Sequence, residues 1–136
     1  MTSTPFSARL DIALVARLRR LSAREGVSVS QLVERFLEEA VREDELPGIV
    51  FRSGPAGRRA GVTGGPDVWE IVRDVRGAEE AGAADAVAHV VASTDVGEDQ
   101  VRLALAYHAA YPDEVDARIA DEAELTARLL AATSSG

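Results

Sequence analysis

The chain has 136 residues, a formal net charge of −8 and no cysteine. This length corresponds to one ordinary domain or two very small ones, and 46% hydrophobic residues suffice for a core, which excludes wholesale disorder. The absence of cysteine excludes disulfides and thiolate metal sites. No apolar run approaches the ~18 residues of a membrane span, and no signal pattern opens the chain, so we expect a cytoplasmic protein without membrane contact.

The charge is distributed unevenly along the chain. Residues 1–33 hold five arginines and two acidic residues (+3), and residues 34–45 hold two arginines and six acidic residues (−4). Residues 46–78 hold five arginines and three acidic residues (+2), and residues 79–136 hold three arginines and twelve acidic residues (−9). Phosphate repels an acidic segment, so the net charge argues against nucleic-acid binding by the C-terminal half but not by the first 33 residues.

The N-terminal segment alternates in polarity. Phe6, Ala8 and Leu10 lie on one face and Ser7 and Arg9 on the other, which predicts a short strand over 6–10. A helix follows, because an aspartate that can cap it precedes an apolar stripe and a glycine ends it. The residues that give this pattern are Asp11, Leu14, Val15, Leu18, Leu21 and Gly26.

A second helix is predicted to begin directly after this glycine. Ser28 and Gln31 have the spacing of a capping box, and Leu46-Pro47-Gly48 ends the helix after an acidic run that closes at Glu45. A strand followed by two helices in about 45 residues buries too little apolar surface to stand alone. We therefore expect a dimer in which two strands pair antiparallel above interlocked helices.

The rest of the chain predicts a second, mainly helical domain. Turn chemistry between two short apolar runs indicates a β-hairpin near 49–62. Helices are expected from Pro66, over 83–92, over 98–111 with Val101, Leu105 and His108 on one stripe, and over 113–132. We expect Trp69 in the core. The domain boundaries are 1–45 and 46–132, and 133–136 is expected to be a flexible tail.

The first domain resembles the ribbon-helix-helix (CopG/Arc/MetJ-like) family of DNA-binding proteins. The resemblance rests on the segment from Phe6 to Asp11 and on the entry to the second helix from Gly26 to Leu32. It implies a two-stranded ribbon that enters the major groove, where Ser7 and Arg9 would contact bases. It also implies that Ser28, Val29 and Ser30 at the start of the second helix would hold a backbone phosphate.

The second domain is similar to the DUF433 family. The similarity rests on the segment from Pro47 to Phe51, on Gly64 to Val72, and on Tyr111 to Asp116. It implies a small helix-turn-helix-like fold and an antitoxin-like role, with a PIN-like ribonuclease toxin as partner. The helix that would read DNA opens with Glu98 and Asp99, which disfavours groove insertion and favours dimerisation or partner binding.

Three arginines of the hairpin are candidates for partner or extra DNA contacts: Arg52, Arg58 and Arg59. An arginine can fill a carboxylate cluster in a toxin as a charge-paired plug. A solvated hairpin tip, or additional phosphate contacts beside the ribbon, explains the same residues. The sequence leaves both interpretations open.

No nucleophile, base and orienting residue occur in a catalytic pattern, so we expect no enzyme, no catalytic residue and no cofactor. His89 and His108, the two histidines, lack ligand-like spacing to acids, so we expect no metal site.

The expected fold class is mainly α, with an N-terminal ribbon-helix-helix and a C-terminal small helical, helix-turn-helix-like domain that carries a short β-hairpin. The expected function is that of a dimeric, sequence-specific transcriptional regulator of antitoxin type, which represses its own operon and neutralises a PIN-like toxin. Its partners would be operator double-stranded DNA, a second copy (with a higher oligomer left open) and that toxin, in the bacterial cytoplasm at the nucleoid. The alternative is a protein–protein interaction module whose ribbon only dimerises.

Overall fold

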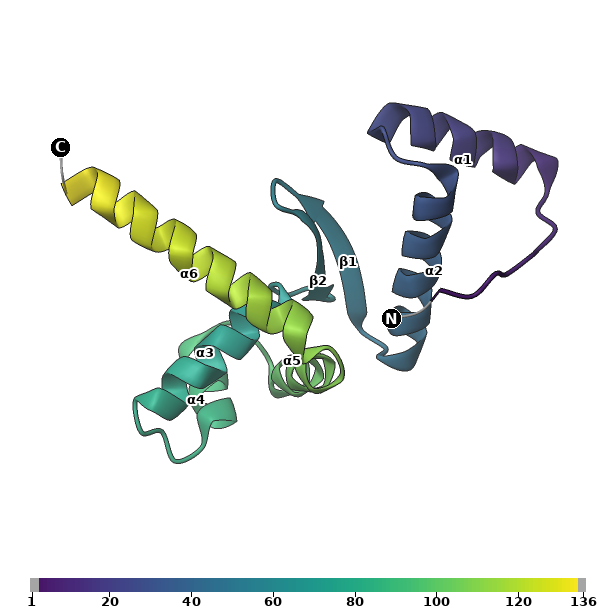
Figure 1. The fold of residues 1–136 in the computed structure, drawn as a ribbon. Coiled ribbons are helices and arrows are strands. Elements are labelled where there is room, and N and C mark those ends of the chain that lie inside the picture. The colour runs from purple at the N-terminus through teal and green to yellow at the C-terminus, as the bar shows by residue number, and fades with distance from the viewer. Residues whose placement is uncertain (1–2, 135–136) are drawn as a thin grey trace. The chain divides into compact units, whose positions relative to one another are not determined.

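The computed structural model describes residues 3–134, which fold as two compact units divided between Val41 and Arg42 (Figure 1). The described chain is mainly α-helical, with one two-stranded antiparallel sheet in the second unit. This confirms the predicted fold class. No described helix is long and apolar enough to cross a membrane.

The first unit is a pair of helices whose ends follow the predicted caps. Helix α1 spans Ile12–Glu25 and helix α2 spans Val29–Glu45, the last turn of which belongs to the second unit. The Asp11 carboxylate accepts a hydrogen bond from the Ala13 N–H at 3.0 Å and so caps α1. Gly26 ends α1 at φ 71°, a left-handed conformation that costs a residue with a Cβ more than it costs glycine.

The predicted strand over 6–10 is absent from the single chain. Residues 3–11 are exposed and belong to no helix or strand. A strand exists only through hydrogen bonds to a neighbouring strand, and the part of the chain that the structure describes pairs no strand with this segment. The alternating pattern of Phe6 to Leu10 is therefore not accompanied by strand pairing in the described residues.

A β-hairpin follows the end of α2 in the second unit, as predicted. Strand β1 (Ile49–Gly54) pairs antiparallel with β2 (Gly57–Val62), from Ile49 opposite Val62 to Gly54 opposite Gly57. Gly48, just before β1, has φ 104°, and a Cβ there would meet Leu103 Cδ2 at 2.8 Å. The backbone conformation thus favours glycine at this position, and any Cβ would also force the Leu103 side chain to shift.

Four helices follow the hairpin: α3 (Val68–Glu80), α4 (Ala86–Ser93), α5 (Glu98–Ala110) and α6 (Pro112–Ser134). Pro66 precedes α3 and Asp67 is its N-cap, so the helix begins two residues later than predicted. Likewise α4 begins at Ala86, because the Asp85 carboxylate caps it by accepting from the Ala88 N–H. Pro112 starts α6, since the first turn of a helix tolerates proline.

The core of the second unit lies between the hairpin and helices α3, α4, α5 and α6. Its deepest residues on α5 are Val101, Ala104 and Tyr107. Of the predicted stripe, Val101 is buried as expected, whereas Leu105 and His108 are only half-buried. Its buried side chains are Ile49, Ala60, Val62, Val68, Ile71, Val72, Val75, Ala78, Val90, Val96, Val101, Ala104, Tyr107 and Val115. Trp69 is half-buried at the edge of this core, so it packs against the core rather than inside it.

Candidate nucleic-acid interface

The segment that precedes α1 carries the side chains predicted to read bases. Ser7 and Arg9 are both exposed, and so are Phe6 (84% exposed) and Leu10 (47%) on the opposite side of the alternation. An exposed apolar side chain at every second position is what a strand shows when its buried face has no cover. In the single chain Ser7 and Arg9 are available to a ligand, but no ribbon holds them in place.

The start of α2 has the geometry of an anion site at a helix N-terminus. The Ser28 Oγ accepts from the Gln31 N–H at 3.1 Å, and the Gln31 Oε1 accepts from the Ser28 N–H at 2.9 Å, which forms the predicted capping box. This box leaves the N–H groups of Val29 and Ser30, in the first helical turn, without an intrahelical acceptor. Both the open donors and the helix dipole favour a phosphate here.

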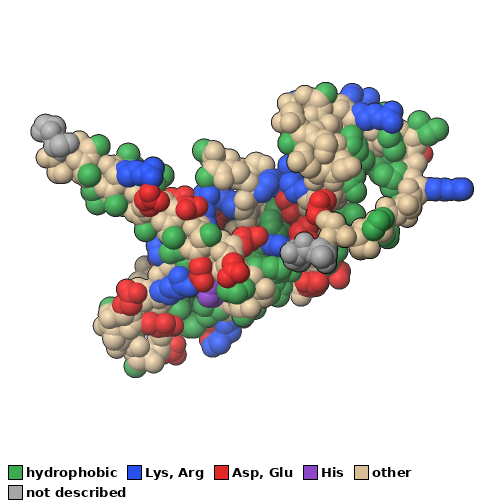
Figure 2. Space-filling view, viewed as in Figure 1, with side chains coloured by type: hydrophobic (Ala, Val, Ile, Leu, Met, Phe, Trp, Pro, Cys, Tyr) green, Lys and Arg blue, Asp and Glu red, His purple; other side chains and the backbone are tan. Residues whose placement is uncertain are grey.

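A basic, partly apolar cavity lies between the two helices of the first unit. It has a volume of about 400 Å³ and is lined by Leu14, Leu18, Leu21 and Phe36 together with Arg17, Arg20 and Arg24. Figure 2 shows arginine side chains in blue on the visible face of α1. Leucines and a phenylalanine in an open cavity indicate that the apolar side of this unit is left uncovered by its own chain.

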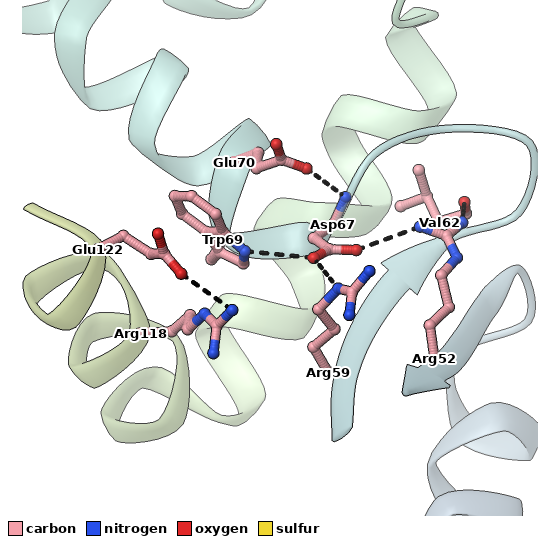
Figure 3. Close-up of polar contacts among 8 residues, drawn as sticks. All are labelled: Arg52, Arg59, Val62, Asp67, Trp69, Glu70, Arg118 and Glu122. Atoms are coloured by element: carbon pink, nitrogen blue, oxygen red, sulfur yellow. Dashed lines mark hydrogen bonds and ion pairs between the residues drawn. The ribbon is translucent and has the colours of Figure 1, made fainter. Parts of the chain in front are cut away.

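The hairpin arginines meet a buried carboxylate instead of projecting together into solvent. Arg52 and Arg59 lie directly opposite each other in the strand register, an arrangement that is repulsive by itself. Asp67, 7% exposed, lies between them: its Oδ1 is 3.2 Å from the Arg52 Nη1 and its Oδ2 is 2.5 Å from the Arg59 Nε (Figure 3). Trp69 Nε1 also donates to this carboxylate at 3.3 Å.

Two glycines make room for these guanidinium groups. A Cβ on Gly61 would lie 2.5 Å from the Arg52 Nη1, and a Cβ on Gly54 would overlap the guanidinium of Arg59. The Arg52 Nη2 also donates to the Val62 carbonyl at 2.7 Å. Two of the three arginines proposed for partner contacts therefore hold the hairpin to the start of α3.

Arg58 has a different environment. It is exposed, and its Nη1 donates to the Ser53 Oγ at 2.9 Å across the hairpin. The sequence analysis proposed all three arginines for partner or extra DNA contacts, whereas the structure divides them between an internal ion pair and an exposed hairpin position. Asp67 is the residue that this reasoning missed as their partner, although an aspartate just before a helix was a visible signal.

Helices α4 and α5 are joined by a short turn, in agreement with the predicted helix-turn-helix spacing. The first turn of α5 carries Glu98 and Asp99, both exposed, and Arg102 Nη2 pairs with the Glu98 Oε1 at 2.8 Å. The Glu98 carboxylate, through a hydrogen bond first and its charge second, raises the pKa of Arg102. The start of α5 is therefore acidic, and phosphate would be repelled there.

A polar network that the sequence did not predict surrounds Tyr107. Its ring is fully buried, and its hydroxyl donates to a Glu114 carboxylate oxygen and accepts from the Arg42 Nη1 at 2.7 Å. Arg42 also stacks on the Tyr111 ring at 3.8 Å and pairs with Glu114 at 2.8 Å. Burial first and the Glu114 carboxylate second raise the pKa of Tyr107, so the hydroxyl keeps its proton and can donate.

A second network joins α3, α5 and α6. His108 Nε2 lies 2.8 Å from the Asp116 Oδ1, and Arg76 pairs with the same oxygen. The hydrogen bond from His108 first, and that from Arg76 second, lower the pKa of Asp116. His108 thus has an acidic neighbour in the fold, because residues eight positions apart meet across a helix boundary.

Comparison with known families identifies the first unit only. Residues 4–44 match the family model of the ribbon-helix-helix proteins, copG family, and this range takes in the exposed segment, α1 and nearly all of α2. The match ends before the hairpin, so the resemblance of the second unit to the DUF433 family stays a prediction. No curated protein and no solved structure matches the chain. The N-terminal unit is therefore similar to the ribbon-helix-helix family, whose members are typically DNA-binding transcription regulators.

Proposed function

We propose that this chain is a dimeric, sequence-specific DNA-binding transcriptional regulator that contacts its operator through the first unit. The observation that carries the proposal is the unequal burial of the two units. Among the described residues, the buried hydrophobic side chains number two in the first unit, Leu18 and Leu32, whereas the second unit holds the other fourteen. The first unit therefore needs a second chain to complete its core.

A second copy is the partner that suits this unit. The uncovered residues lie on both its helices and on the segment before them, so two chains can cover each other by pairing strands and interlocking helices. The cavity beside α1 would receive side chains of the second copy. The large exposed hydrophobic residues of the unit are Phe6, Leu10, Ile12, Leu14, Phe36, Leu37 and Val41.

Dimerisation would also create the DNA-reading surface. Two copies of the segment over 6–10, paired antiparallel, form a ribbon narrow enough for the major groove, with Ser7 and Arg9 of both copies on the outer face. An arginine can donate two hydrogen bonds to a guanine, which discriminates by about 1–3 kcal/mol. The N–H groups of Val29 and Ser30, with the Ser28 hydroxyl, would bind phosphates on either side of the ribbon.

The test is a binding titration of the purified chain with DNA from upstream of its own gene. Arg9→Ala should weaken binding at least tenfold, because each dimer loses two base contacts, while sedimentation still shows a dimer. Arg102→Ala is the matched control, since it removes the same charge from an acidic helix start. Binding by the parent should fall steeply with salt as counterions are released. Equal binding by Arg9→Ala and the control would contradict the proposed ribbon.

The competing function is an interaction module whose ribbon only dimerises. It predicts a dimer by sedimentation and no DNA binding even at low salt. The proposed regulator and this module share the dimer, so the titration with DNA decides between them.

We extend the proposal to an antitoxin role, in which the protein represses its own operon and neutralises a PIN-like ribonuclease. The resemblance of residues 47–119 to the DUF433 family supports it. Arg58, at the exposed end of the hairpin, is the residue proposed to enter the carboxylate cluster of the toxin. Co-purification with the product of the neighbouring gene should be lost in Arg58→Ala and kept in Arg73→Ala, a change at another exposed arginine. Loss in neither variant would remove Arg58 from this role.

A further inference from the structure

Helix α6 extends well beyond the core that holds its first half. Val115 is buried, and Arg118, Ile119 and Glu122 are half-buried against the second unit. From Ala123 to Ser134 every residue is exposed, over about three turns (Figure 1). The second half of α6 therefore has no cover within the described part of its own unit.

The uncovered half carries an apolar face of its own. Leu125 and Leu129 are four residues apart and lie on one side of the helix, which is turned by roughly 80° from the stripe of Val115 and Ile119. These leucines are 49% and 61% exposed. Leu130 is also exposed, at 65%, but lies about 100° around the helix from Leu129 and about 140° from Leu125, so it is outside the face that these two leucines share.

A helical end of this length is marginal in water when nothing packs on it. Isolated helices shorter than about 12–15 residues are rarely stable, and most helical stability in proteins comes from packing of an apolar face. Within the exposed half of α6, residues 123–134, the structure gives an i,i+4 ion pair between Glu124 and Arg128. Such an i,i+4 pair contributes little, so the helix is best explained by a partner surface on Leu125 and Leu129.

Charge argues for the nature of that partner. Residues 79–122 hold two arginines and eleven acids, a balance of −9, whereas residues 123–136 hold only Glu124 and Arg128, a balance of zero. A basic partner would be attracted most strongly to the acidic part of the second unit, residues 79–122. The neutral end of α6, which is green and tan towards its tip in Figure 2, can approach a copy of itself without repulsion.

We propose that the exposed half of α6, residues 123–134, packs through Leu125 and Leu129 against the same segment of a second copy of this chain. Two-fold symmetry makes the contact self-complementary, with Leu125 of one copy against Leu129 of the other if the helices run antiparallel. The inference rests on the proposed dimer, because each leucine buries only on the order of 100 Å². This is far below the roughly 1,200 Å² of a stable interface. The ribbon-helix-helix dimer supplies the second α6 at a high effective concentration.

The test is amide hydrogen exchange of residues 123–134 in the full-length purified chain. We expect these amides to be protected at concentrations where sedimentation shows a dimer, and to lose protection on dilution to monomer. Leu129→Gln should lower the protection about tenfold, since both copies lose a buried leucine. Leu130→Gln is the matched control, being the same substitution one residue away, and should change protection less than about twofold.

The possible results separate this inference from the proposed function. A dimer whose α6 amides are unprotected, or respond equally to both substitutions, overturns the pairing of α6 and leaves the regulator intact. Protection that persists in the diluted monomer also overturns it, because the helix then needs no second copy. A chain that is monomeric at every concentration overturns the proposed dimer itself, and the pairing with it.

Discussion

The substitution Asp67→Asn removes the carboxylate that lies between two opposed arginines. Asp67 is close to the Arg59 Nε (2.5 Å), the Arg52 Nη1 (3.2 Å) and the Trp69 Nε1 (3.3 Å), and it is 7% exposed. Asp67→Asn preserves size and still allows the side chain to accept a hydrogen bond. The substitution leaves Arg52 and Arg59 facing each other without a neutralising charge, so we expect the second unit to lose stability.

The expected loss follows from the burial of the three groups. Removing one partner of a fully buried ion pair costs about 3–5 kcal/mol, because the other charge is left without compensation. The side chains of Arg52 and Arg59 are 32% and 28% exposed, so water can hydrate them in part. Since asparagine also retains one acceptor, we expect a destabilisation of about 2 kcal/mol.

Urea unfolding followed by Trp69 fluorescence measures this effect in the unit concerned. Trp69 is the only tryptophan of the chain and lies on α3 of the second unit, so its signal does not mix the two units. With a urea dependence of about 1–3 kcal/mol per M, the midpoint should fall by about 1 M. Circular dichroism at 222 nm should show that the variant is helical before urea is added.

Asp74→Asn is the matched control. The Asp74 carboxylate pairs with Arg73 at 3.1 Å, but the side chains are 36% and 50% exposed, so its loss should cost less than about 0.5 kcal/mol. If Asp67→Asn and Asp74→Asn shift the midpoint equally, the argument that Asp67 neutralises the hairpin arginines is wrong.

Three further predictions concern the caps and the two polar networks. Gly26→Ala should destabilise the first unit by about 1–2 kcal/mol, read from the thermal unfolding of the dimer, because φ is 71° there. The pKa of Tyr107 is raised in the folded chain, so its protonated hydroxyl contributes fully to stability below the ordinary pKa of 10.0, and this contribution is lost as the pH rises above it. Tyr107→Phe should therefore flatten the fall in unfolding midpoint above pH 10. The lowered pKa of Asp116 acts in the opposite direction: its effect is present above 3.8 and is lost as the pH falls, so Asp116→Asn should flatten the fall in midpoint below pH 4. A variant that follows the parent curve in either pH range would contradict the corresponding network.

The sequence predicted those elements that depend on residues close together in the chain. The Asp11 cap, the Ser28–Gln31 box and the glycine at position 26 each involve residues at most a few positions apart, and the structure forms all three. The hairpin was predictable for the same reason, since its turn lies between two short apolar runs. The strand predicted over 6–10 has a local alternating pattern, but a strand also needs hydrogen bonds to a neighbouring strand, and the described chain forms no strand there.

Long-range pairing explains what the sequence did not predict. Asp67 meets Arg52 and Arg59 because the hairpin folds back beside the start of α3, and no spacing rule encodes that contact. On α5, helical periodicity permits both the stripe of Leu105 and His108 and that of Ala104 and Tyr107. Tyr107 takes the buried position because Arg42 and Glu114 satisfy its hydroxyl, a condition set by residues on two other helices.

The second unit completes its hydrophobic core within a single chain, and the first unit does not. The second unit closes its core around fourteen buried side chains, whereas the first leaves residues such as Phe6 and Phe36 exposed. If the first unit gains its core only on dimerisation, its folding and its DNA affinity both depend on the concentration of the chain. The operator would then be occupied only when the chain is abundant. Dilution would separate the two copies, and the ribbon that contacts the bases would be lost with the dimer. The net charge of −8 would act in the same direction, because the acidic second unit would weaken non-specific DNA binding by the proposed dimer.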